Sequence, residues 1–213
     1  MPWDIEEVEA KLNSAFEHNS ELELLSVLKE NSFLFYELYG RKGGICPAFH
    51  EVDFGSKLRC DFAWLNDNSD GPEWVLVEIE APKIRIFNKD NTPTKELNKA
   101  VDQVTSWRRY FSVNPAEKRR IFGAVATFRY VLVAGDSTLW GTEDALKWRT
   151  DFNQNNSLEI RSSGVFYRAL QAIKDKPTDF WSFEDNPITL PYTQLEAYWR
   201  SYGYMDKMRA IYS

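Results

Sequence analysis

Residues 74–83, WVLVEIEAPK, decide which fold the sequence is expected to adopt. Their apolar and β-branched start is typical of a buried strand, which we place at residues 74–81. Glu78 and Glu80 lie two positions apart, and therefore on the same face of that strand. Burying two neighbouring carboxylates is costly. The strand end is therefore either open to water or close to a positive charge.

The composition is that of one globular domain, because 43% of the 213 residues are hydrophobic and 15% are aromatic. Lys and Arg number 26 against 32 Asp and Glu, which gives a net charge of -6. This balance argues against binding nucleic acid through bulk charge, but it leaves room for a local basic patch or a metal-bridged contact. Cys46 and Cys60 match no zinc motif and are expected to be buried thiols in a reducing compartment.

The N-terminus, MPWDIEEVEA, is acidic, whereas a secretion signal begins with basic residues and continues with an apolar segment. No apolar stretch of the sequence approaches the ~20 residues needed to cross a bilayer. We therefore expect a cytoplasmic protein with no membrane partner.

Hydrophobic periodicity predicts an α/β fold in which helices and strands share most of the chain. The expected helices cover residues 3–16, 20–30, 95–111, 142–153 and 164–174. The expected strands cover residues 45–54, 58–65, 74–81, 129–135 and 158–162. Turns are expected at GRKGG, residues 40–44, and at NDNSDGP, residues 66–72. The short second turn makes the strands on either side of it antiparallel neighbours.

Local signals support several of these elements. Ser20 and Glu23 form a capping-box pattern, and Thr94 is a suitable N-cap for the helix at 95–111. The second helix has an apolar stripe of Leu24, Leu25 and Leu28. The strand at 58–65 alternates between Leu58, Cys60, Phe62 and Trp64 on one face and Arg59, Asp61 and Ala63 on the other. Residues 129–135 are continuously apolar, as in a strand covered on both faces.

Four polar residues occupy positions where the pattern expects apolar ones: Asp61, Glu78, Glu80 and Gln103. If the strands at 58–65 and 74–81 are neighbours, Asp61 and Glu78 approach each other. Two carboxylates ~5 Å apart repel by about 3 kcal/mol at an effective dielectric constant of ~20. A divalent cation removes this repulsion, and oxygen ligands without His or Cys favour Mg²⁺ or Mn²⁺ over zinc.

Each of these residues also has a simpler interpretation, because most charged side chains are solvated. Glu78 and Glu80 could form the exposed end of a strand. Asp61 could pair with Arg59 or cap a turn, and Gln103 could lie on the surface of its helix. Only the combination of all four positions favours a metal site.

The most basic stretch of the sequence lies at residues 107–120, which contain WRRYF and EKRR. Arg108 and Arg109 are candidates for contacts with DNA phosphates. A solvated helix end is the alternative, because the helix dipole favours basic residues there. Trp107 is expected in the core rather than as a platform for base stacking.

The order αβββαβ, with Asp61, the Glu78-Ile79-Glu80 segment and Gln103 on the following helix, resembles the PD-(D/E)XK nuclease superfamily. More narrowly, the segments HEV, LRCDFAW, EWVLVEIEAP and TPTKELNKAVDQVTSW are similar to the nuclease domain of the Shedu anti-phage defence proteins. The resemblance covers about residues 20–172. It implies a restriction-endonuclease-like core with a central mixed sheet flanked by helices.

The resemblance also implies roles for individual residues. Asp61 and Glu78 would hold the metal, and the main-chain carbonyl of Ile79 would complete the ligation. Gln103 would lie near the site, and an acidic residue of the leading helix, Glu23, would join it.

Position 80 departs from the superfamily pattern, because Glu80 replaces the usual Lys. Some restriction endonucleases of this fold also use Glu there and remain active. Glu80 would then be a metal ligand or a general base, and Lys83 is a possible substitute cation. The resemblance thus implies a Mg²⁺- or Mn²⁺-dependent endodeoxyribonuclease acting in anti-phage defence. The alternative is a catalytically weak module of the same fold that binds DNA or a partner protein.

We divide the chain into an N-terminal helix at residues 1–19, a nuclease-like domain at residues 20–175 and a C-terminal segment at residues 176–213. The last segment is dense in Trp, Tyr and Phe. Such a segment is expected to be helical and to pack on the core or on a second copy of the chain. A homo-oligomer is expected because a DNA duplex has two strands.

Overall fold

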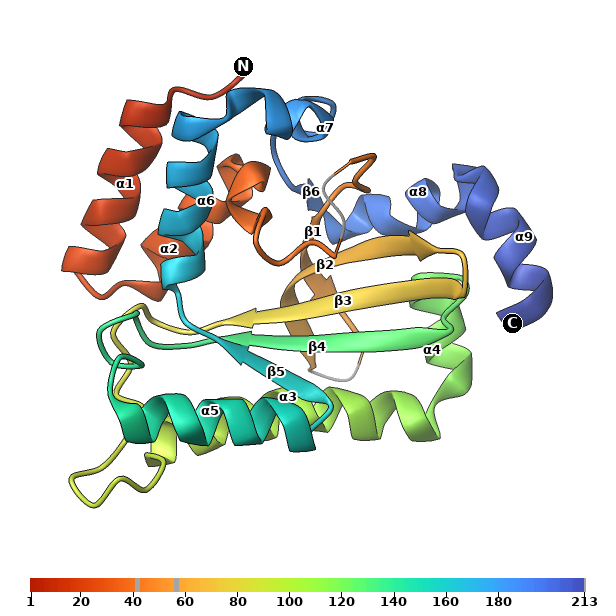
Figure 1. Ribbon diagram of the computed structural model, residues 1–213. Helices are drawn as coiled ribbons and strands as arrows, with labels where there is room; N and C mark the ends of the chain where they lie inside the picture. Colours follow the sequence, from red (N-terminus) through yellow and green to blue (C-terminus); the bar gives the residue numbers. More distant parts are fainter. Residues whose placement is uncertain (41–42, 56–57, 213) are drawn as a thin grey trace.

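Six strands form one mixed sheet in the order β5-β4-β3-β2-β1-β6 in the computed structural model, which describes residues 1–40, 43–55 and 58–212 (Figure 1). The strands are β1 (Phe49–Asp53), β2 (Arg59–Asn68), β3 (Gly71–Ile79), β4 (Thr127–Val133), β5 (Leu158–Arg161) and β6 (Leu190–Pro191). β1, β2 and β3 are antiparallel, whereas β3, β4 and β5 are parallel and β6 is parallel to β1. The expected α/β class with a mixed central sheet is confirmed.

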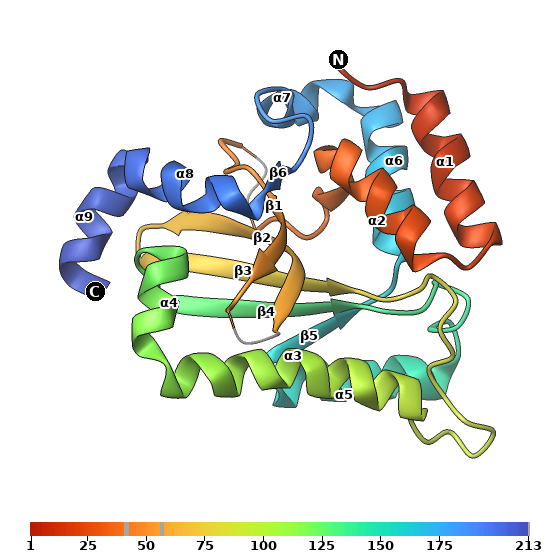
Figure 2. The ribbon, with the colours of Figure 1, turned by 180° about the vertical axis from the view of Figure 1, so that it is seen from behind.

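Helices cover both faces of the sheet (Figures 1 and 2). The α-helices are α1 (Ile5–Glu17), α2 (Glu21–Glu30), α3 (Lys95–Val113), α4 (Pro115–Phe122), α5 (Glu143–Asn155), α6 (Gly164–Asp175), α7 (Trp181–Glu184), α8 (Leu195–Ser201) and α9 (Gly203–Tyr212). Short 3-10 turns lie at Ser32–Phe35, Pro177–Phe180 and Tyr192–Gln194. One core lies under α1, α2 and α6, and the other under α3, α4 and α5 with α8 and α9 at its margin.

The predicted helix starts at Ser20 and Thr94 are confirmed. The Ser20 side chain accepts a hydrogen bond from the Glu23 amide at 3.2 Å, and the Thr94 hydroxyl accepts one from the Leu97 amide at the same distance. Leu24 is fully buried, as the apolar stripe of α2 requires. The turn expected at residues 40–44 falls partly outside the described residues.

Two sequence expectations differ from the structure. The basic stretch is divided between two helices, because Asn114 ends α3 and Pro115 begins α4, a helix that was not among those expected. Arg119 and Arg120 lie exposed in the last turn of α4, in agreement with the alternative of a solvated helix end. The predicted alternation of β2 is wrong at Cys60, which lies in the α3 core, whereas Phe62 and Trp64 lie in the α1 core. Helices cover β2 on both faces, so a strictly polar face is not needed there.

The β2–β3 hairpin sets the register that positions the polar residues. The two strands pair from Asn68↔Gly71 to Phe62↔Val77, and Gly71 has a positive φ of 117° at the turn. On β3, Trp74 and Leu76 face the α3 core, whereas the intervening residues face the α1 core. Strand alternation therefore directs the next even position, Glu78, towards α3.

The aromatic C-terminal segment packs on the core of its own chain, which is the first of the two arrangements expected from the sequence. Trp199 of α8 is 4% exposed, and its indole Nε1 donates to the Ile121 carbonyl at 2.9 Å. The guanidinium groups of Arg200 and Arg209 lie 4.9 and 5.3 Å from the centroid of the Trp199 ring. Gly123 permits this packing, because a Cβ there would lie 2.7 Å from the ring. Among the described helices, none combines the length and the apolar character that spanning a bilayer requires.

Candidate functional site

Asp61 and Glu78 lie together at the end of the β2–β3 ladder. The last main-chain pair is Phe62↔Val77, and beyond it Asp61 Oδ2 accepts a hydrogen bond from the Ile79 amide at 2.8 Å. The Asp61 side chain thus replaces the main-chain acceptor where the ladder stops. Glu78 is 8% exposed. The interpretation of Glu78 as a solvated strand end is therefore wrong.

Gln103 reaches the same point from α3. Its Nε2 donates a hydrogen bond to Glu78 Oε1. The buried side chains of α3 on either side, Ala100, Val104 and Trp107, fix the helix against the sheet and turn Gln103 inwards. Gln103 is therefore a site residue rather than a surface residue, and Trp107 belongs to the core as expected.

Burial raises the pKa of both Asp61 and Glu78. For Glu78 the negative charges of Asp61, Glu80 and Glu21 add to the effect of burial, and Arg59 opposes it. For Asp61 the hydrogen bond from Ile79 lowers the pKa but does not offset the burial. The carboxylates are therefore close enough to repel one another, and neither forms an ion pair with a basic side chain in the described structure.

Glu80 follows the last residue of β3, and its amide donates to the Val133 carbonyl at 2.9 Å. Its side chain is half-buried. Burial raises its pKa to about 7, with further upward contributions from Glu21 and Asp61 and an opposing one from Lys99. Glu80 is thus electrostatically part of the same cluster as the two acids before it.

Glu21 of α2 is the acidic residue that the leading helix brings to the site. Burial raises its pKa, while Arg59 and Lys99 lower it. Glu23 points elsewhere, because it accepts a hydrogen bond from Ser14 and pairs with His18 at 3.1 Å. We name Glu21, Asp61, Glu78 and Glu80 the acidic cluster.

The sequence does contain a pattern that points to Glu21 as the site residue of α2, although the capping box draws attention to Glu23. Glu21 lies three positions before Leu24 and seven before Leu28, so it shares the core-facing stripe of α2. Glu23 lies on another side of the helix. Spacing from the buried leucines was a better guide here than the capping pattern.

The cations that act on the acidic cluster through charge include Arg59 at the start of β2 and Lys99 on α3, and Lys29 of α2 acts on Asp61. Among them, Lys99 is the one that opposes the raised pKa of Glu80. Lys99 precedes Gln103 by four residues, which places both on one face of α3. Lys83 lies on the loop after β3, where its amide donates to Asn19 Oδ1 at 2.7 Å.

Arg108 and Arg109 lie on α3 about 8 Å further along the helix axis than Gln103, given a rise of about 1.5 Å per residue. Both are exposed, and Arg108 Nη1 donates to the Ser157 hydroxyl at 2.6 Å. They are outside the acidic cluster. Their contact with DNA phosphates remains a prediction.

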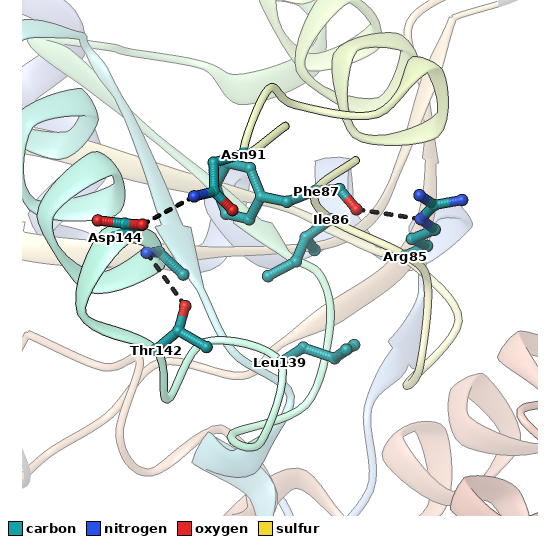
Figure 3. A pocket seen from close by; sticks show the side chains of 8 residues that line it. Arg85, Ile86, Phe87, Asn91, Leu139, Thr142 and Asp144 are labelled. Atoms are coloured by element: carbon teal, nitrogen blue, oxygen red, sulfur yellow. Dashed lines mark hydrogen bonds between the residues drawn. The ribbon is translucent and has the colours of Figure 1, made fainter. Parts of the chain in front are cut away.

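The loop after Glu80 is held against α5 beside a cavity of about 160 Å³ (Figure 3). Asn91 donates to Asp144 Oδ2 at 2.8 Å, and the Phe87 ring packs edge-on against Trp140 and Trp148. These contacts anchor the segment that leaves β3.

The donor set of the cluster suits a hard divalent cation, because it consists of carboxylate and amide oxygens with uncompensated negative charge. In the part of the chain that the structure describes, however, no group of three or more His, Cys, Asp or Glu side chains is arranged to hold a metal ion. Asp61 and Glu78 remain as two carboxyl groups that a hard cation could share. Mg²⁺ usually keeps several water ligands and so needs fewer protein ligands than a fully protein-coordinated metal.

The fold and the cluster define a class: an α/β protein with a mixed sheet in which two adjacent strands and a helix bring carboxylates and an amide together. A family model described as Shedu protein SduA, C-terminal, matches residues 18–162. The match covers more than half of the chain, and the chain belongs to this family. Membership suggests a role in anti-phage defence. A comparison with curated proteins found no match.

Substitutions of Asp61 distinguish its role as hydrogen-bond acceptor for the Ile79 amide from its role as a negative charge. Asp61→Ala leaves the Ile79 amide without its acceptor and is expected to lower the free energy of unfolding by about 1–3 kcal/mol. Asp61→Asn removes the same charge but retains an acceptor oxygen, and it is therefore expected to cost less than the alanine variant. Urea denaturation of both variants measures this order. Equal destabilisation by the two substitutions would show that the hydrogen bond to Ile79 contributes nothing.

Proposed function

We propose that this protein is a metal-dependent DNA endonuclease with a restriction-endonuclease-like core, acting in anti-phage defence. The observation that supports this most is the acidic cluster, in which a buried Glu78 lies beside Asp61 and is contacted by Gln103. A cluster of mutually repelling carboxylates costs folding free energy and is retained for a function. Hydrolysis of a phosphodiester with a hard cation is the chemistry that it fits.

Asp61, Glu78 and the Ile79 carbonyl would hold Mg²⁺ or Mn²⁺. When bound, the cation would polarise a phosphoryl oxygen and lower the pKa of a water. Gln103 fixes the orientation of the Glu78 carboxylate through its hydrogen bond. The β2–β3 register and the hydrogen bond from the Ile79 amide hold Asp61 against the end of β3. Asp61 and Ile79 would therefore need little movement to bind a cation. Glu80 would either join the ligands or hold a proton of the attacking water.

Lys99 would supply the positive charge that Lys provides at position 80 in the superfamily pattern. It faces the cluster from α3, on the face that also presents Gln103, and its charge acts on Glu80 and Glu21. An ammonium group there would stabilise negative charge that develops on a phosphoryl group.

Lys99→Met is expected to lower kcat for DNA cleavage by about tenfold to a hundredfold, because it removes one cation from the reacting centre. Lys147→Met is the matched control, since Lys147 is exposed on α5 and pairs only with Glu143 at 2.5 Å in the described structure. Steady-state cleavage of a labelled duplex measures both variants. Equal rates for Lys99→Met and the wild type would refute the assignment.

The test of the proposal is cleavage of DNA by purified protein. Supercoiled plasmid and linear duplex are incubated with the wild type in Mg²⁺, in Mn²⁺ and in EDTA, and a melting curve verifies that the protein is folded. Cleavage is expected with either metal and none with EDTA. Intact DNA under every metal condition would exclude the endonuclease proposal.

A second candidate is a module of the same fold that binds DNA or a partner protein without cleaving. It is favoured by Glu80 in place of Lys and by the lack, among the described side chains, of a ready three-carboxylate metal site. Gel-shift and cleavage assays of wild type and Glu78→Ala distinguish the two. Equal DNA binding without cleavage by either protein supports the binding module, and cleavage by the wild type alone excludes it.

A further inference from the structure

Three arginines from three different elements converge at the β5 end of the sheet. Arg149 of α5, Arg161 at the end of β5 and Arg168 of α6 line a cavity of about 360 Å³, which we name the arginine pocket. The other residues that line it are Thr150, Asn153, Gln154, Ile160 and Ser162. All but Ile160 bring polar side chains, and none of these described residues is acidic.

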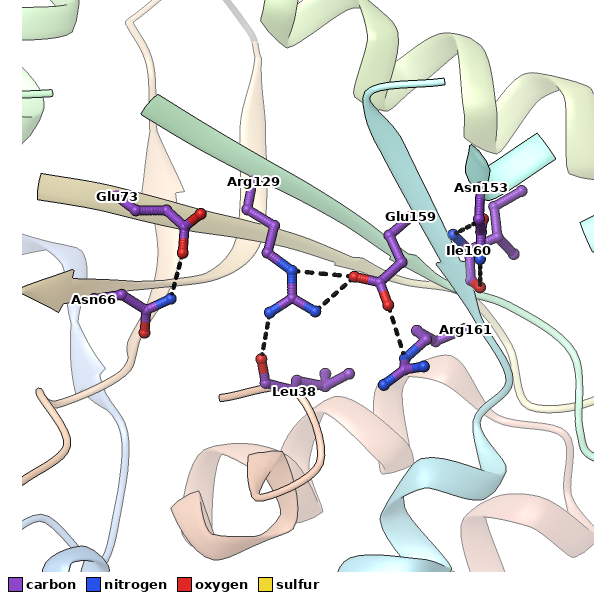
Figure 4. Close-up of polar contacts among 8 residues, drawn as sticks. All are labelled: Leu38, Asn66, Glu73, Arg129, Asn153, Glu159, Ile160 and Arg161. Atoms are coloured by element: carbon purple, nitrogen blue, oxygen red, sulfur yellow. Dashed lines mark hydrogen bonds and ion pairs between the residues drawn. The ribbon is translucent and has the colours of Figure 1, made fainter. Parts of the chain in front are cut away.

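The positive charge of the pocket is only partly balanced by nearby acids. Arg161 Nε lies 3.1 Å from Glu159 Oε1, which makes an ion pair without a hydrogen bond (Figure 4). The Glu159 carboxylate also accepts two hydrogen bonds from Arg129. Arg168 lies 3.7 Å from Glu37 Oε2. One carboxylate is thus shared between two arginines, and the second makes a long contact.

Arg149 has no acidic partner among the described side chains; its guanidinium instead lies 5.0 Å from the centroid of the Trp140 ring. Burial, followed by the charges of Arg161 and Arg168, lowers its pKa. The three guanidinium groups therefore repel one another in the absence of an anion. In a chain of net charge -6, such a local excess of positive charge indicates an anionic ligand.

One side chain of the pocket lining, Asn153, is hydrogen-bonded to the main chain of β5. Asn153 Oδ1 accepts from the Ile160 amide at 2.8 Å, and its Nδ2 donates to the Ile160 carbonyl at 3.1 Å (Figure 4). This side chain occupies the main-chain groups of the strand beside the pocket. The arginines, and not these main-chain groups, are consequently the main donors that a ligand meets there.

We propose that the arginine pocket binds a phosphate group. Guanidinium groups present paired N–H donors in one plane. This arrangement matches two oxygens of a phosphate group and suits a phosphate better than a monatomic anion such as chloride. Hydroxyl and amide side chains of the lining supply further donors. A volume of about 360 Å³ accommodates a phosphate with part of a nucleoside, since small-molecule sites begin at about 300 Å³.

The pocket and the acidic cluster lie at the same end of the sheet, where the parallel strands β3 and β5 finish. The register pairs Ile79 with Val133 and Val133 with Arg161, so β3 and β5 end at the same level. Two strand spacings of about 4.8 Å separate them by about 10 Å. A nucleic acid could therefore contact both, whereas a free nucleotide would occupy the pocket alone. Phosphate binding itself does not depend on the nuclease proposal.

Calorimetric titration in EDTA tests the proposal. The probes are inorganic phosphate, a deoxynucleoside monophosphate and a short single-stranded oligonucleotide, each added to wild type, Arg149→Gln, Arg168→Gln and Arg200→Gln. Arg200 is the control, because it lies on α8 and pairs with Glu196. Each pocket variant is expected to bind phosphate about tenfold more weakly than the wild type, and Arg200→Gln equally well. Melting curves without phosphate verify folding.

The probes also identify the source of the phosphate. Competition between the oligonucleotide and inorganic phosphate supports a nucleic-acid backbone, and binding of the mononucleotide without the oligonucleotide supports a free nucleotide. Failure of folded wild type to bind any probe overturns the proposal. Equal weakening in Arg200→Gln and the pocket variants also overturns it, because binding would then follow net charge alone.

Discussion

Glu78→Gln is expected to slow metal-dependent cleavage strongly and at the same time to stabilise the metal-free protein. The substitution keeps the shape of the side chain but removes the charge that a cation needs. Loss of 3–4 kcal/mol of transition-state stabilisation corresponds to a decrease in kcat of about a hundredfold to a thousandfold. Cleavage assays in Mg²⁺ measure this loss.

The gain in stability follows from the repulsion within the acidic cluster. Burial and the neighbouring charges raise the pKa of Glu78, so ionisation favours the unfolded chain at neutral pH. Glutamine removes this cost, which is absent below the ordinary Glu pKa and grows as the pH rises above it. We expect a gain of about 2 kcal/mol, or about 5 °C in Tm, with a larger effect at pH 8 than at pH 5.

Glu73→Gln is the matched control for both measurements. Glu73 lies on the same strand, five residues away, and its carboxylate accepts a hydrogen bond from Asn66 at 2.7 Å (Figure 4). This variant is expected to cleave at the wild-type rate without becoming more stable. A Glu78→Gln protein that melts below the wild type in EDTA would contradict the electrostatic description of the cluster.

Trp199→Ala is expected to lower the free energy of unfolding by about 3–5 kcal/mol, because it leaves a large cavity and an unpaired Ile121 carbonyl. For a chain of this size the loss corresponds to a decrease of about 10 °C in Tm. Scanning calorimetry measures it. The result would make the C-terminal segment part of the folding unit rather than an appendage.

Tyr192→Ala is the control for the C-terminal segment, since Tyr192 is 43% exposed. Its effect is expected to stay within about 0.5 kcal/mol. Light scattering on the same samples separates packing from assembly. If Trp199→Ala leaves Tm unchanged but reduces the molar mass in solution, the segment stabilises a homo-oligomer instead of the core of its own chain.

The sequence predicted the parts of the site that depend on local periodicity. Asp61 and Glu78 were placed together because strand alternation and a short turn leave one register, and Gln103 followed from the apolar stripe of α3. The arginine pocket was not predicted. Its three arginines lie on α5, β5 and α6, and only the tertiary packing of these elements brings them together.

The fold shows the same division between local and tertiary signals. Helix caps such as Ser20 and Thr94 were found in their expected places. The start of α4 at Pro115 was missed because the basic residues that follow obscured a short amphipathic pattern. The burial of β2 on both faces was also missed, since it depends on helices distant in sequence that cover the strand.

The Asn153 side chain that closes β5 has a consequence for behaviour at high concentration. An unpaired strand at the margin of a sheet is a template for polymerisation. At one margin, the side-chain amide of Asn153 already forms hydrogen bonds with the main-chain N–H and C=O groups of Ile160. The opposite margin is the two-residue strand β6, which ends at Pro191, a residue without a main-chain N–H donor. Neither margin can readily add a strand from another molecule. Crowded solutions of this protein should therefore resist fibril formation, and assemblies have to form through side-chain surfaces.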